Sequence, residues 1–406
     1  MRRAPALSFL LVTVFVDMLG LGLVVPIVPA LMTAVTGHAA DAARWSGVIG
    51  SSYGVLQFLS APLLGRISDR YGRRPVLLAS LACLGVDYLG HAIAPTAWLL
   101  LLFHALAGAC AGTNTVVNAY IADVTEPDRR ARAFGLVGSA FGLGFVAGPT
   151  VGGLLGAVDV RLPFYAAAGL AFANVAYGYL ILPESRRGDR TTPLTLRHAN
   201  PFGSLAAVLR RPMLGRLASA RFCADVARMT NQSVWTFFVA YQFAWGTAHV
   251  GITMAAAALA GAAFQARLVA PAVRRLGDKR AAVLGGALGV AAVGGTAFAS
   301  APWALYALQA VGVLSSVGAA AAQSWLSGAT GPEEQGTVQG ALTGIGAIAE
   351  AAVPAAAGAL FAWSLAYSRP GLVFLAAAAF AAASTLLLAT TPTRAAISPE
   401  RSPYAG

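Results

Sequence analysis

The chain has 406 residues, of which 57% are hydrophobic and 11% are charged, and its mean hydropathy is positive. A soluble protein of this length needs more charged surface, so the composition excludes an ordinary soluble domain and favours a membrane protein. The net charge of +12 would suit a nucleic-acid partner, but the positions of the basic residues, described below, argue against one.

Twelve apolar segments follow one another along the chain. Each has roughly 20 residues, about the length that an α-helix needs to cross a hydrocarbon core of about 30 Å. We therefore predict an all-α membrane protein with twelve transmembrane helices, whose many Ala and Gly residues favour close helix packing. The predicted spans are 7–33, 45–64, 75–94, 98–122, 134–156, 163–183, 214–241, 249–273, 281–300, 303–325, 336–361 and 370–391.

The first span follows Arg2 and Arg3, as the apolar part of a signal peptide would. Asp17 interrupts the apolar run, no small-x-small cleavage site follows cleanly, and further spans come after it. We interpret the segment as an uncleaved first helix. A charged residue at a helix centre costs about 2.5–3.5 kcal/mol, so Asp17 is a candidate for function.

Other ionisable residues lie within later spans: Asp87 in the third, Asp225 in the seventh and Glu350 in the eleventh. Burial disfavours the charged form of a carboxyl group, which suits a site that alternates between protonated and ionised forms. We expect Asp17 and Asp87 to bind protons and substrate, and Asp225 and Glu350 are further candidates for proton coupling. The alternatives are a buried structural ion pair or a residue near the end of a span.

A charged loop with the sequence GRISDRYGRRPVLL, residues 65–78, separates the second span from the third. Gly65 permits close approach of two helices, and Asp69 can cap a helix end. Arginines hold such a loop on the positive side of a membrane. This loop is the most informative segment of the chain.

The fifth span is rich in glycine around Pro149. Gly-x-x-x-Gly spacing places small residues on one helix face, and proline removes a backbone donor and bends a helix. A tight, bent helix of this kind suits a gating role, with ordinary small-residue packing as the alternative. The residues concerned are Gly142, Gly144, Gly148, Pro149, Gly152, Gly153 and Gly156.

A long polar segment, 184–213, divides the chain into an N-terminal half, 1–183, and a C-terminal half, 214–406. The second half carries a weak copy of the charged loop, and aligning Gly277 with Gly72 gives an offset of 205 residues, about half the chain. Two unrelated bundles would not predict that offset. We expect two six-helix halves that rock about a site near the midplane, linked on the cytoplasmic side.

The basic residues are unevenly distributed among the connections. Of the 28 Lys and Arg residues, 22 lie at the chain ends or in even-numbered connections. This positive-inside bias places both termini in the cytoplasm and argues against a nucleic-acid partner. The exceptions are Arg44, Arg161 and Arg369 in odd-numbered connections, and Arg221, Arg228 and Arg267 within spans.

The sequence offers no nucleotide-binding, hydrolytic or metal constellation. The chain has a single lysine, Lys279, and its three cysteines lie within predicted spans without C-x-x-C spacing. We expect no cofactor, no metal, no disulfide and no enzymatic activity. One charge moving through 100 mV releases about 2.3 kcal/mol, which suffices to drive export.

An apolar cavity with a few polar groups is the expected substrate site. Five residues are candidates on depth in the membrane alone, with helix packing as the equal alternative: Asn114, Asn118, Gln232, Trp235 and Gln323.

The pattern G-x-x-x-D-R-x-G-R-R resembles the signature loop of major facilitator superfamily transporters. The run G-x-x-x-G-P-x-x-G-G in the fifth span is similar to the motif of the antiporter branch. The whole chain resembles the bacterial tetracycline efflux proteins, which implies proton-driven export of a drug-like molecule across the bacterial cytoplasmic membrane. We expect a monomer. The similar segments are 17–29, 68–78, 87–89, 120–123, 141–144, 147–149, 182–185, 264–266, 335–336 and 339–340.

By position, the resemblance implies that Asp17 and Asp87 are the family's intramembrane acids and that Gln57 and Gln265 contact substrate. It also implies a cytoplasmic gate in which loop charges pair with the end of the fourth helix in one state only. The expected gating residues are Gly65, Asp69, Arg70, Gly72, Arg73, Arg74, Asp123, Gly144, Gly148, Pro149, Gly152 and Gly153.

Three positions depart from that family: His104 replaces an arginine, Gly261 a histidine and Gly289 an acid. Tetracycline pumps carry a metal-chelated, charged drug, so the missing carboxylate leaves the substrate and the proton stoichiometry open. Asp225, Glu350 and nearby arginines are an alternative network. His104 either titrates near neutral pH or is a hydrogen-bonded packing residue.

Two other functions remain open. One is export of an endogenous metabolite, such as a sugar or a biosynthetic product. The other is a non-transporting membrane sensor, against which the short tails and loops argue.

Overall fold

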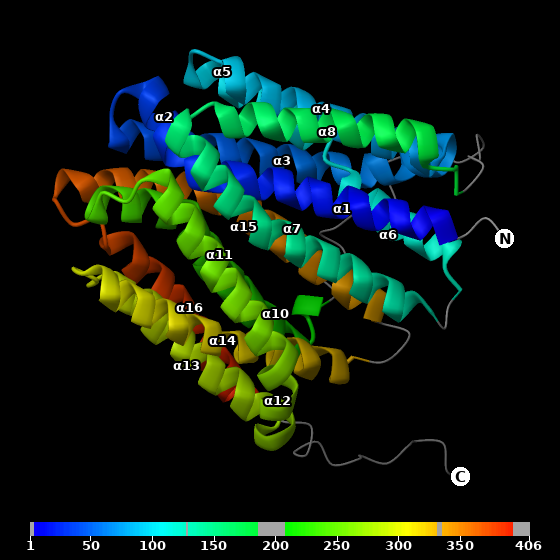
Figure 1. Cartoon of the computed structure of the whole chain (residues 1–406). Helices are drawn as coiled ribbons and strands as arrows, with labels where there is room; N and C mark the ends of the chain where they lie inside the picture. The colour runs from blue at the N-terminus through cyan, green and yellow to red at the C-terminus, as the bar shows by residue number, and fades with distance from the viewer. Residues whose placement is uncertain (1–3, 127–128, 186–207, 331–334, 393–406) are drawn as a thin grey trace, which may run out of the picture.

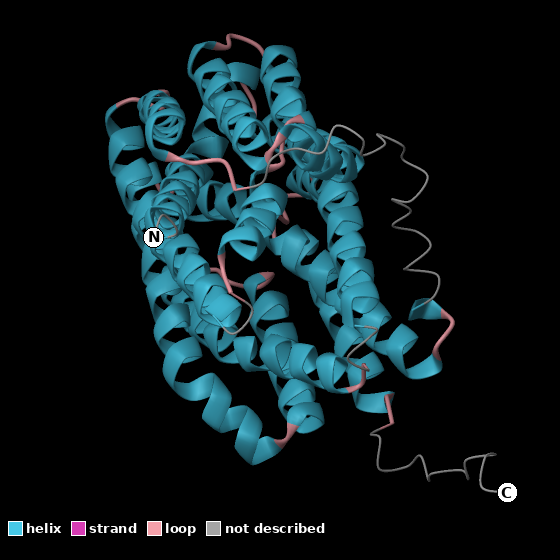
Figure 2. Ribbon diagram, turned by 90° about the vertical axis from the view of Figure 1, so that its right-hand side faces the viewer, coloured by secondary structure: helices cyan, strands magenta, loops and turns pink. Residues whose placement is uncertain are grey.

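The computed structural model consists of helices and loops in the residues that it describes, which are 4–126, 129–185, 208–330 and 335–392 (Figure 2). No strand occurs among these residues, so the predicted all-α fold class is confirmed. Nine of the described helical segments are long and apolar enough to cross a membrane.

The helices before Ser185, called here the first group, occupy the upper part of Figure 1. Pro26 and Pro29 cannot donate to a helical hydrogen-bond ladder, and a short 3₁₀ turn, Val25–Ile27, interrupts the first span there. The helices are α1 (Ala4–Val24), α2 (Val28–Thr36), α3 (Ala39–Tyr71), α4 (Arg73–Ile93), α5 (Ala97–Ala109), α6 (Thr113–Val124), α7 (Arg130–Val158) and α8 (Leu162–Ile181).

The helices after Val208 form the second group, in the lower part of Figure 1. Between α11 and α12 the chain makes one π-helical turn, Gln265–Val269. The helices are α10 (Pro212–Phe243), α11 (Thr247–Phe264), α12 (Ala270–Leu276), α13 (Asp278–Thr296), α14 (Pro302–Gly328), α15 (Gln335–Ala366) and α16 (Leu372–Thr390).

Each of the twelve predicted spans has a helical counterpart in chain order, and nine of these pass the test of length and hydropathy. The counterparts of the other three spans are shorter or less apolar, because one is interrupted and two contain charged residues. The fourth is broken into α5 and α6 at residues 110–112, α10 carries four charged residues, and α13 begins with Asp278, Lys279 and Arg280. The helices are consistent with twelve spans.

The arginine-rich loops define one end of the molecule, which we call the arginine end. The α3–α4 loop lies there in the first group, and the start of α10 and the α12–α13 loop lie there in the second. Arg216 donates to the carbonyl oxygen of Thr390, and Lys279 donates to that of Thr391, so α16 ends at this end too.

Of the five apolar cores in the described residues, three show how the two groups are held together. One core at the arginine end contains only first-group residues, including Phe9, Leu77 and Tyr120. A second core at the same end contains only second-group residues, including Leu217 and Trp325. The third core lies at the opposite end and joins both groups. We call it the shared core, and its members include Met32, Ile49, Leu100, Phe237, Phe361 and Phe374.

Small residues allow the two groups to touch at that opposite end. On α3, a Cβ at Gly47 or Gly54 would collide with the backbone of α15, and the Ser51 hydroxyl accepts a hydrogen bond from the Ala355 amide at 3.0 Å. Between α7 and α11, the Thr247 hydroxyl donates to the Gly153 carbonyl oxygen at 3.0 Å. The division at 184–213 stays a prediction, because 186–207 lie outside the described residues.

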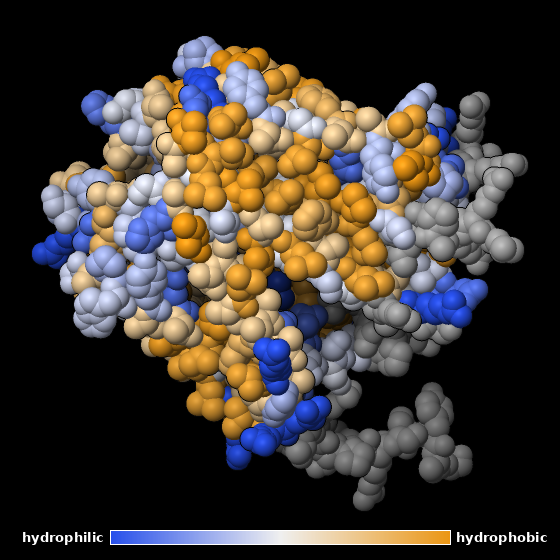
Figure 3. Space-filling view, in the orientation of Figure 1, coloured by the Kyte–Doolittle hydropathy of each residue, from blue (hydrophilic) through white to orange (hydrophobic). Residues whose placement is uncertain are grey.

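The surface has the distribution of a membrane protein. Hydrophobic residues cover the middle of the face in Figure 3, and hydrophilic residues gather toward its edges. Large apolar side chains such as Leu143 on α7 and Leu180 on α8 are exposed. Exposure of such large apolar side chains is unfavourable in water but not in contact with lipid chains.

Candidate functional site

The loop between α3 and α4 is organised by Arg73, which is 6% exposed. Its Nη2 atom lies 2.8 Å from Asp69 Oδ1, and its Nε atom lies 3.2 Å from Asp123 Oδ2 at the end of α6. Its Nη1 atom donates to the hydroxyl of Ser68 at 2.6 Å. The predicted gate charges Asp69, Arg73 and Asp123 are therefore in direct contact.

Glu184, which the sequence did not assign to the gate, holds the start of α4. Its Oε1 atom accepts a hydrogen bond from the Arg73 amide at 2.8 Å, and its Oε2 atom accepts one from the Arg74 amide at 3.2 Å. A carboxylate at a helix N-terminus satisfies free amides and complements the helix dipole. Gly72 has φ +102°, and a Cβ there would collide with the Glu184 carboxylate. Glu184, and not Asp69, therefore acts as the cap.

The glycine face of α7 packs against two helices. Gly144, Gly148 and Gly152 lie against the backbone of α1, and an added Cβ at any of them would meet α1 atoms. Gly153 lies against Thr247 of α11, and the Pro149 carbonyl oxygen lies against Gly251 of α11. Pro149 stands inside α7 without ending it. These small residues let α7 approach a first-group helix and a second-group helix at once.

Asp17 lies within α1, and its Oδ1 atom is buried with no hydrogen-bond partner among the described residues. The ring of Tyr88 packs beside the next turn of α1, at Gly20. The Tyr53 hydroxyl on α3 is within electrostatic range of Asp17, Asp87 and Glu350. These acids therefore share one polar region within an apolar bundle.

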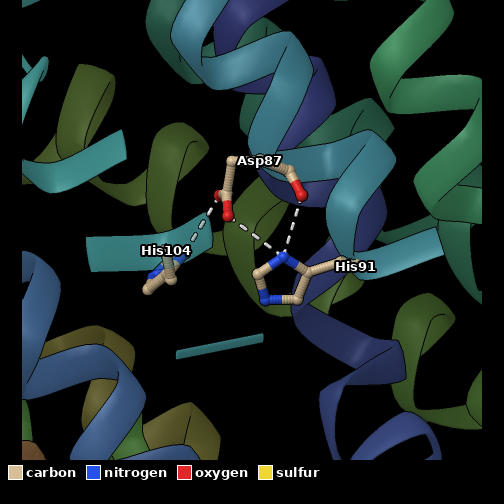
Figure 4. Close-up of side chains that lie close together, drawn as sticks. All are labelled: Asp87, His91 and His104. Carbon is tan, nitrogen blue, oxygen red and sulfur yellow. Dashed lines mark hydrogen bonds and ion pairs between the residues drawn. The ribbon is translucent and has the colours of Figure 1, made fainter. Parts of the chain in front are cut away.

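Asp87 lies between two histidines (Figure 4). Its side chain is 2% exposed; Oδ1 is 3.0 Å from His91 Nδ1, and Oδ2 is 3.0 Å from His104 Nδ1. Asp87 and His91 are one turn apart on α4, and His104 comes from α5. The sequence identified Asp87 and His104 but missed His91, whose only signal is its i+4 spacing from Asp87.

A carboxylate between two imidazoles can hold and release protons, because a histidine changes charge near neutral pH. Aromatic rings enclose the pair: Tyr53 lies 4.9 Å from the His104 ring, and Phe164 stacks on His91 at 5.6 Å. The three side chains also bring potential metal-ligand atoms within 4.8 Å of one another. His91 Nδ1 also lies 3.0 Å from the backbone oxygen of Asp87, and Asp87 Oδ1 makes no hydrogen bond among the described residues, so one polar atom of the cluster stays unsatisfied.

A second charged cluster lies on α10. Asp225 is 3% exposed, and its Oδ2 atom is 2.7 Å from Arg221 Nε, while Oδ1 is 3.3 Å from Arg228 Nη2. Arg228 Nη1 also donates to Gln232 Oε1 at 3.3 Å. The side chains of Arg221, Asp225 and Arg228 thus form one contiguous cluster.

A cavity of about 740 Å³ lies beside this cluster. Helices α10, α11, α13, α14, α15 and α16 form nearly all of its wall, and Phe145 of α7 contributes from the first group. This cavity lies within the second group. The substrate site that the sequence predicts at the midplane between the halves stays a prediction.

The residues expected to bind substrate are spread over several locations. Trp235, Gln323 and Asp225 line the cavity. Gln57 is half-buried on α3, and Glu350 is half-buried on α15, where its backbone contacts Gly54. The rest do not line it: Asp17, Asp87 and Gln232 lie elsewhere, Asn118 and Gln265 are exposed, and the side chain of Asn114 lies outside the described part of the structure.

Comparison with known proteins agrees with this architecture. The family model of the Major Facilitator Superfamily matches residues 10–354. The tetracycline resistance protein of class C from Escherichia coli is 35% identical over 379 residues, covering 93% of this chain and 95% of that protein. The class G protein from Vibrio anguillarum is 34% identical, covering 89% of this chain and 91% of its own length.

Solved structures share the fold at lower identity. The human organic anion transporter MFSD10 has a TM-score of 0.66 and 22% identity, covering 96% of this chain and all of that one. A bacterial homologue of the human lysosomal transporter Spinster, inward-facing and unoccupied, has a TM-score of 0.73 and 16% identity, covering 96% and 94%. With its motifs, fold and relatives in agreement, the chain belongs to the major facilitator superfamily, a family of membrane transporters and not of enzymes.

Proposed function

We propose that the protein exports a drug-like small molecule, tetracycline being the first candidate, in exchange for protons across the cytoplasmic membrane of a bacterium. The relatives named as tetracycline resistance proteins support this substrate, since they are similar over about nine-tenths of the chain. The substrates of the transport reaction are then one small molecule and protons, and the protein acts as a monomer.

The observation that carries the proposal is the buried, unpartnered oxygen of Asp17. An ionised carboxylate without partners is costly inside an apolar bundle, and a bound proton removes its charge. Asp17 is therefore stable when protonated and ionises when water or a cationic group reaches it. That difference is what a coupling site needs.

The Asp87 cluster is the second proton-holding site in this proposal. His91 and His104 each contact one carboxylate oxygen, so the cluster can change its proton content without breaking apart. Glu350 is near enough to Tyr53 to belong to the same region. Asp225 contacts two arginines, which suits positioning of those arginines better than proton release.

The three cores support alternating access. Among the described residues, the two groups share a core only at the end opposite the arginines, and their cores are separate at the arginine end. By the positive-inside rule the arginine end is cytoplasmic, so this conformation is open to the cytoplasm. Export requires the halves, 1–183 and 214–406, to rock about a site near the midplane until the arginine end closes.

The gate is proposed to act through Arg73. In the present conformation Arg73 holds both Asp69 and Asp123, and Glu184 caps α4. Exchange of such pairs between two arrangements gives a two-state switch. The neighbouring Gly65, Arg70, Gly72 and Arg74 complete the loop, while Gly144, Gly148, Pro149, Gly152 and Gly153 on α7 provide the close helix contacts.

Expression in an efflux-deficient bacterial host tests the proposal. We expect resistance to tetracyclines or phenicols that a protonophore abolishes. In proteoliposomes, Asp17→Asn should abolish drug-driven proton exchange, because an amide cannot carry the proton. The control is Asp41→Asn, which should leave the exchange unchanged, because Asp41 is an exposed acid at the end of the molecule opposite the arginine end. Full exchange by Asp17→Asn would remove Asp17 from the mechanism. A well-expressed protein that confers no resistance across the panel would favour a metabolite exporter.

A further inference from the structure

The cavity in the second group has the size of a drug-binding site. Its volume of about 740 Å³ lies within the range of roughly 300–1,000 Å³ that is typical of sites for small molecules. Most of its wall consists of apolar or small residues, among them Ala224, Met254 and Val293. An occupant must therefore have a largely apolar body.

The charges on the cavity wall have a net positive sign. The charged lining residues are Arg221, Asp225 and Arg228, all on α10. The Arg221 and Arg228 side chains are 46% and 54% exposed, whereas that of Asp225 is 4% exposed. The guanidinium groups thus face the open space, and the carboxylate lies beneath them.

The arginines retain donors for a ligand. Arg221 uses Nε to bind Asp225, and its two terminal nitrogens donate to no other group of the described chain. Arg228 uses one terminal nitrogen for Asp225 and the other for Gln232. A guanidinium fork with free N–H groups matches the geometry of a carboxylate, sulfonate or phosphate group. Asp225 holds the forks in place without fully neutralising them.

The opposite wall offers space and no opposing charge. Gly285, Gly286 and Gly289 of α13 line the cavity, and a Cβ at Gly289 would reach Ser315 only at 3.7 Å, an ordinary contact. The uncharged polar residues of the wall include Asn231, Gln309 and Gln323. Glu350 is within electrostatic range of Arg228, but it is not part of the wall.

We infer that this cavity binds an amphipathic organic anion, with a ring-sized apolar body against α13 and α14 and one acidic group against Arg221 and Arg228. The inference rests on the proposed function in taking the occupant to be the transported molecule, and it deepens that function by specifying the charge. A metal-chelated cation, in contrast, would meet two guanidinium groups and a carboxylate that both arginines already engage.

Two dyes of one scaffold and opposite charge provide the test. Binding of fluorescein, an anion, and rhodamine 123, a cation, is measured by fluorescence anisotropy on the purified protein in phosphatidylcholine nanodiscs without a proton gradient. We expect fluorescein to bind at least about tenfold more tightly, the difference that one charge-assisted hydrogen-bond pair supplies. Equal affinities, or a preference for the cation, would overturn the inference.

Variants of the wall locate the anion. Changing Arg221 and Arg228 to Gln leaves Asp225 buried and unpaired, so Asp225→Asn is added to keep the fold intact. This triple variant should lose the preference for fluorescein. The matched control is Arg216→Gln, since Arg216 lies on the same helix outside the cavity. A triple variant that is folded and still prefers fluorescein would contradict the assignment.

Gly289→Asp tests the charge in the opposite direction. The added carboxylate enters the cavity at a position with room for it, so fluorescein should bind more weakly and rhodamine 123 more tightly. Gly289→Asn controls for size. An unchanged preference in Gly289→Asp would show that the dyes bind elsewhere, which also contradicts the inference.

Lipid composition distinguishes two sources of the anionic group. If phosphatidylglycerol in the nanodiscs blocks fluorescein binding, the acidic group is that of a lipid; if it does not, the occupant is a soluble solute. These measurements need no proton gradient, so failure of proton-driven export leaves them intact. Conversely, export of tetracycline by a protein that prefers the cationic dye would uphold the proposed function and refute this inference.

Discussion

At the scale of single residues, the resemblance to the tetracycline efflux proteins implies an arginine at position 104, where this chain has a histidine in contact with Asp87. An arginine at position 104 would pair with Asp87 permanently, because its charge does not change near neutral pH. The histidine here lies 3.0 Å from the same carboxylate, and histidine is a type of side chain that can gain or lose a proton in that range. We therefore predict that this residue makes the surroundings of Asp87 sensitive to pH.

His104→Arg tests this sensitivity. We expect the dependence of transport on pH between pH 5 and 8 to become flatter, since a fixed charge replaces one that titrates. The measurement is drug-driven proton exchange in proteoliposomes at a series of pH values. His38→Arg, at an exposed position before α3, serves as the control. An identical pH profile in His104→Arg would show that His104 is a packing residue only.

The sequence predicted some site residues well because ionisable side chains are rare in apolar spans. Asp17 and Asp87 stood out for that reason, and the structure places both in one polar region. His91 was missed because its role depends on a carboxylate one turn away. Glu184 was missed because capping of α4 joins residues that are 111 positions apart. Depth alone also selected Asn118, which proves to be exposed.

At the scale of helices, the predicted spans agree with the helices in order and differ at their ends and breaks. The span 45–64 is part of α3. This helix continues beyond the apolar stretch to Tyr71 and includes the charged residues Asp69 and Arg70. The span 98–122 is broken at residues 110–112, where the apolar sequence hides the interruption. Hydropathy detects the apolar part of a helix, whereas backbone hydrogen bonds determine where it begins and ends.

The close crossing of α7 and α11 depends on Gly251. A Cβ at this position would collide with the Pro149 carbonyl oxygen, and overpacking of this kind costs about 1–3 kcal/mol. Gly251→Ala should therefore lower the midpoint of thermal unfolding in detergent by several degrees. Gly261→Ala on the same helix meets open space and should leave the midpoint unchanged or raise it. Equal effects of the two substitutions would argue against the tight contact.

At the scale of the whole molecule, an apolar core joins the two groups at the end opposite the arginines, whereas each group has a separate core at the arginine end of the described structure. The shared core and the contact between Ser51 and Ala355 hold α3 and α15 together at the end opposite the arginines. Export by alternating access requires this contact to open once in every cycle. The superfamily fold was predictable from short motifs, but the conformation was not, because the proposed alternating access requires the same sequence to adopt at least two conformations.

A disulfide across this contact should stop transport. The variant carries Ser51→Cys and Ala355→Cys in a chain whose Cys83, Cys110 and Cys223 are replaced by Ser. Oxidation should abolish drug-driven proton exchange, and a reductant should restore it, because the crosslink holds α3 to α15. The two single-cysteine variants should be insensitive to oxidation. Undiminished transport by the crosslinked protein would contradict alternating access at this interface.

The apolar character of the shared core also makes the balance between conformations depend on temperature. Contacts such as those of Phe237, Phe361 and Ile49 weaken on cooling, as hydrophobic association does in general. The population with this end closed should then fall in the cold, unless the closed arginine end buries an equal apolar area in the other state. In a two-state transporter of this design, the effect of temperature on the conformational equilibrium would therefore depend on how equal the apolar areas are that its two ends bury when closed.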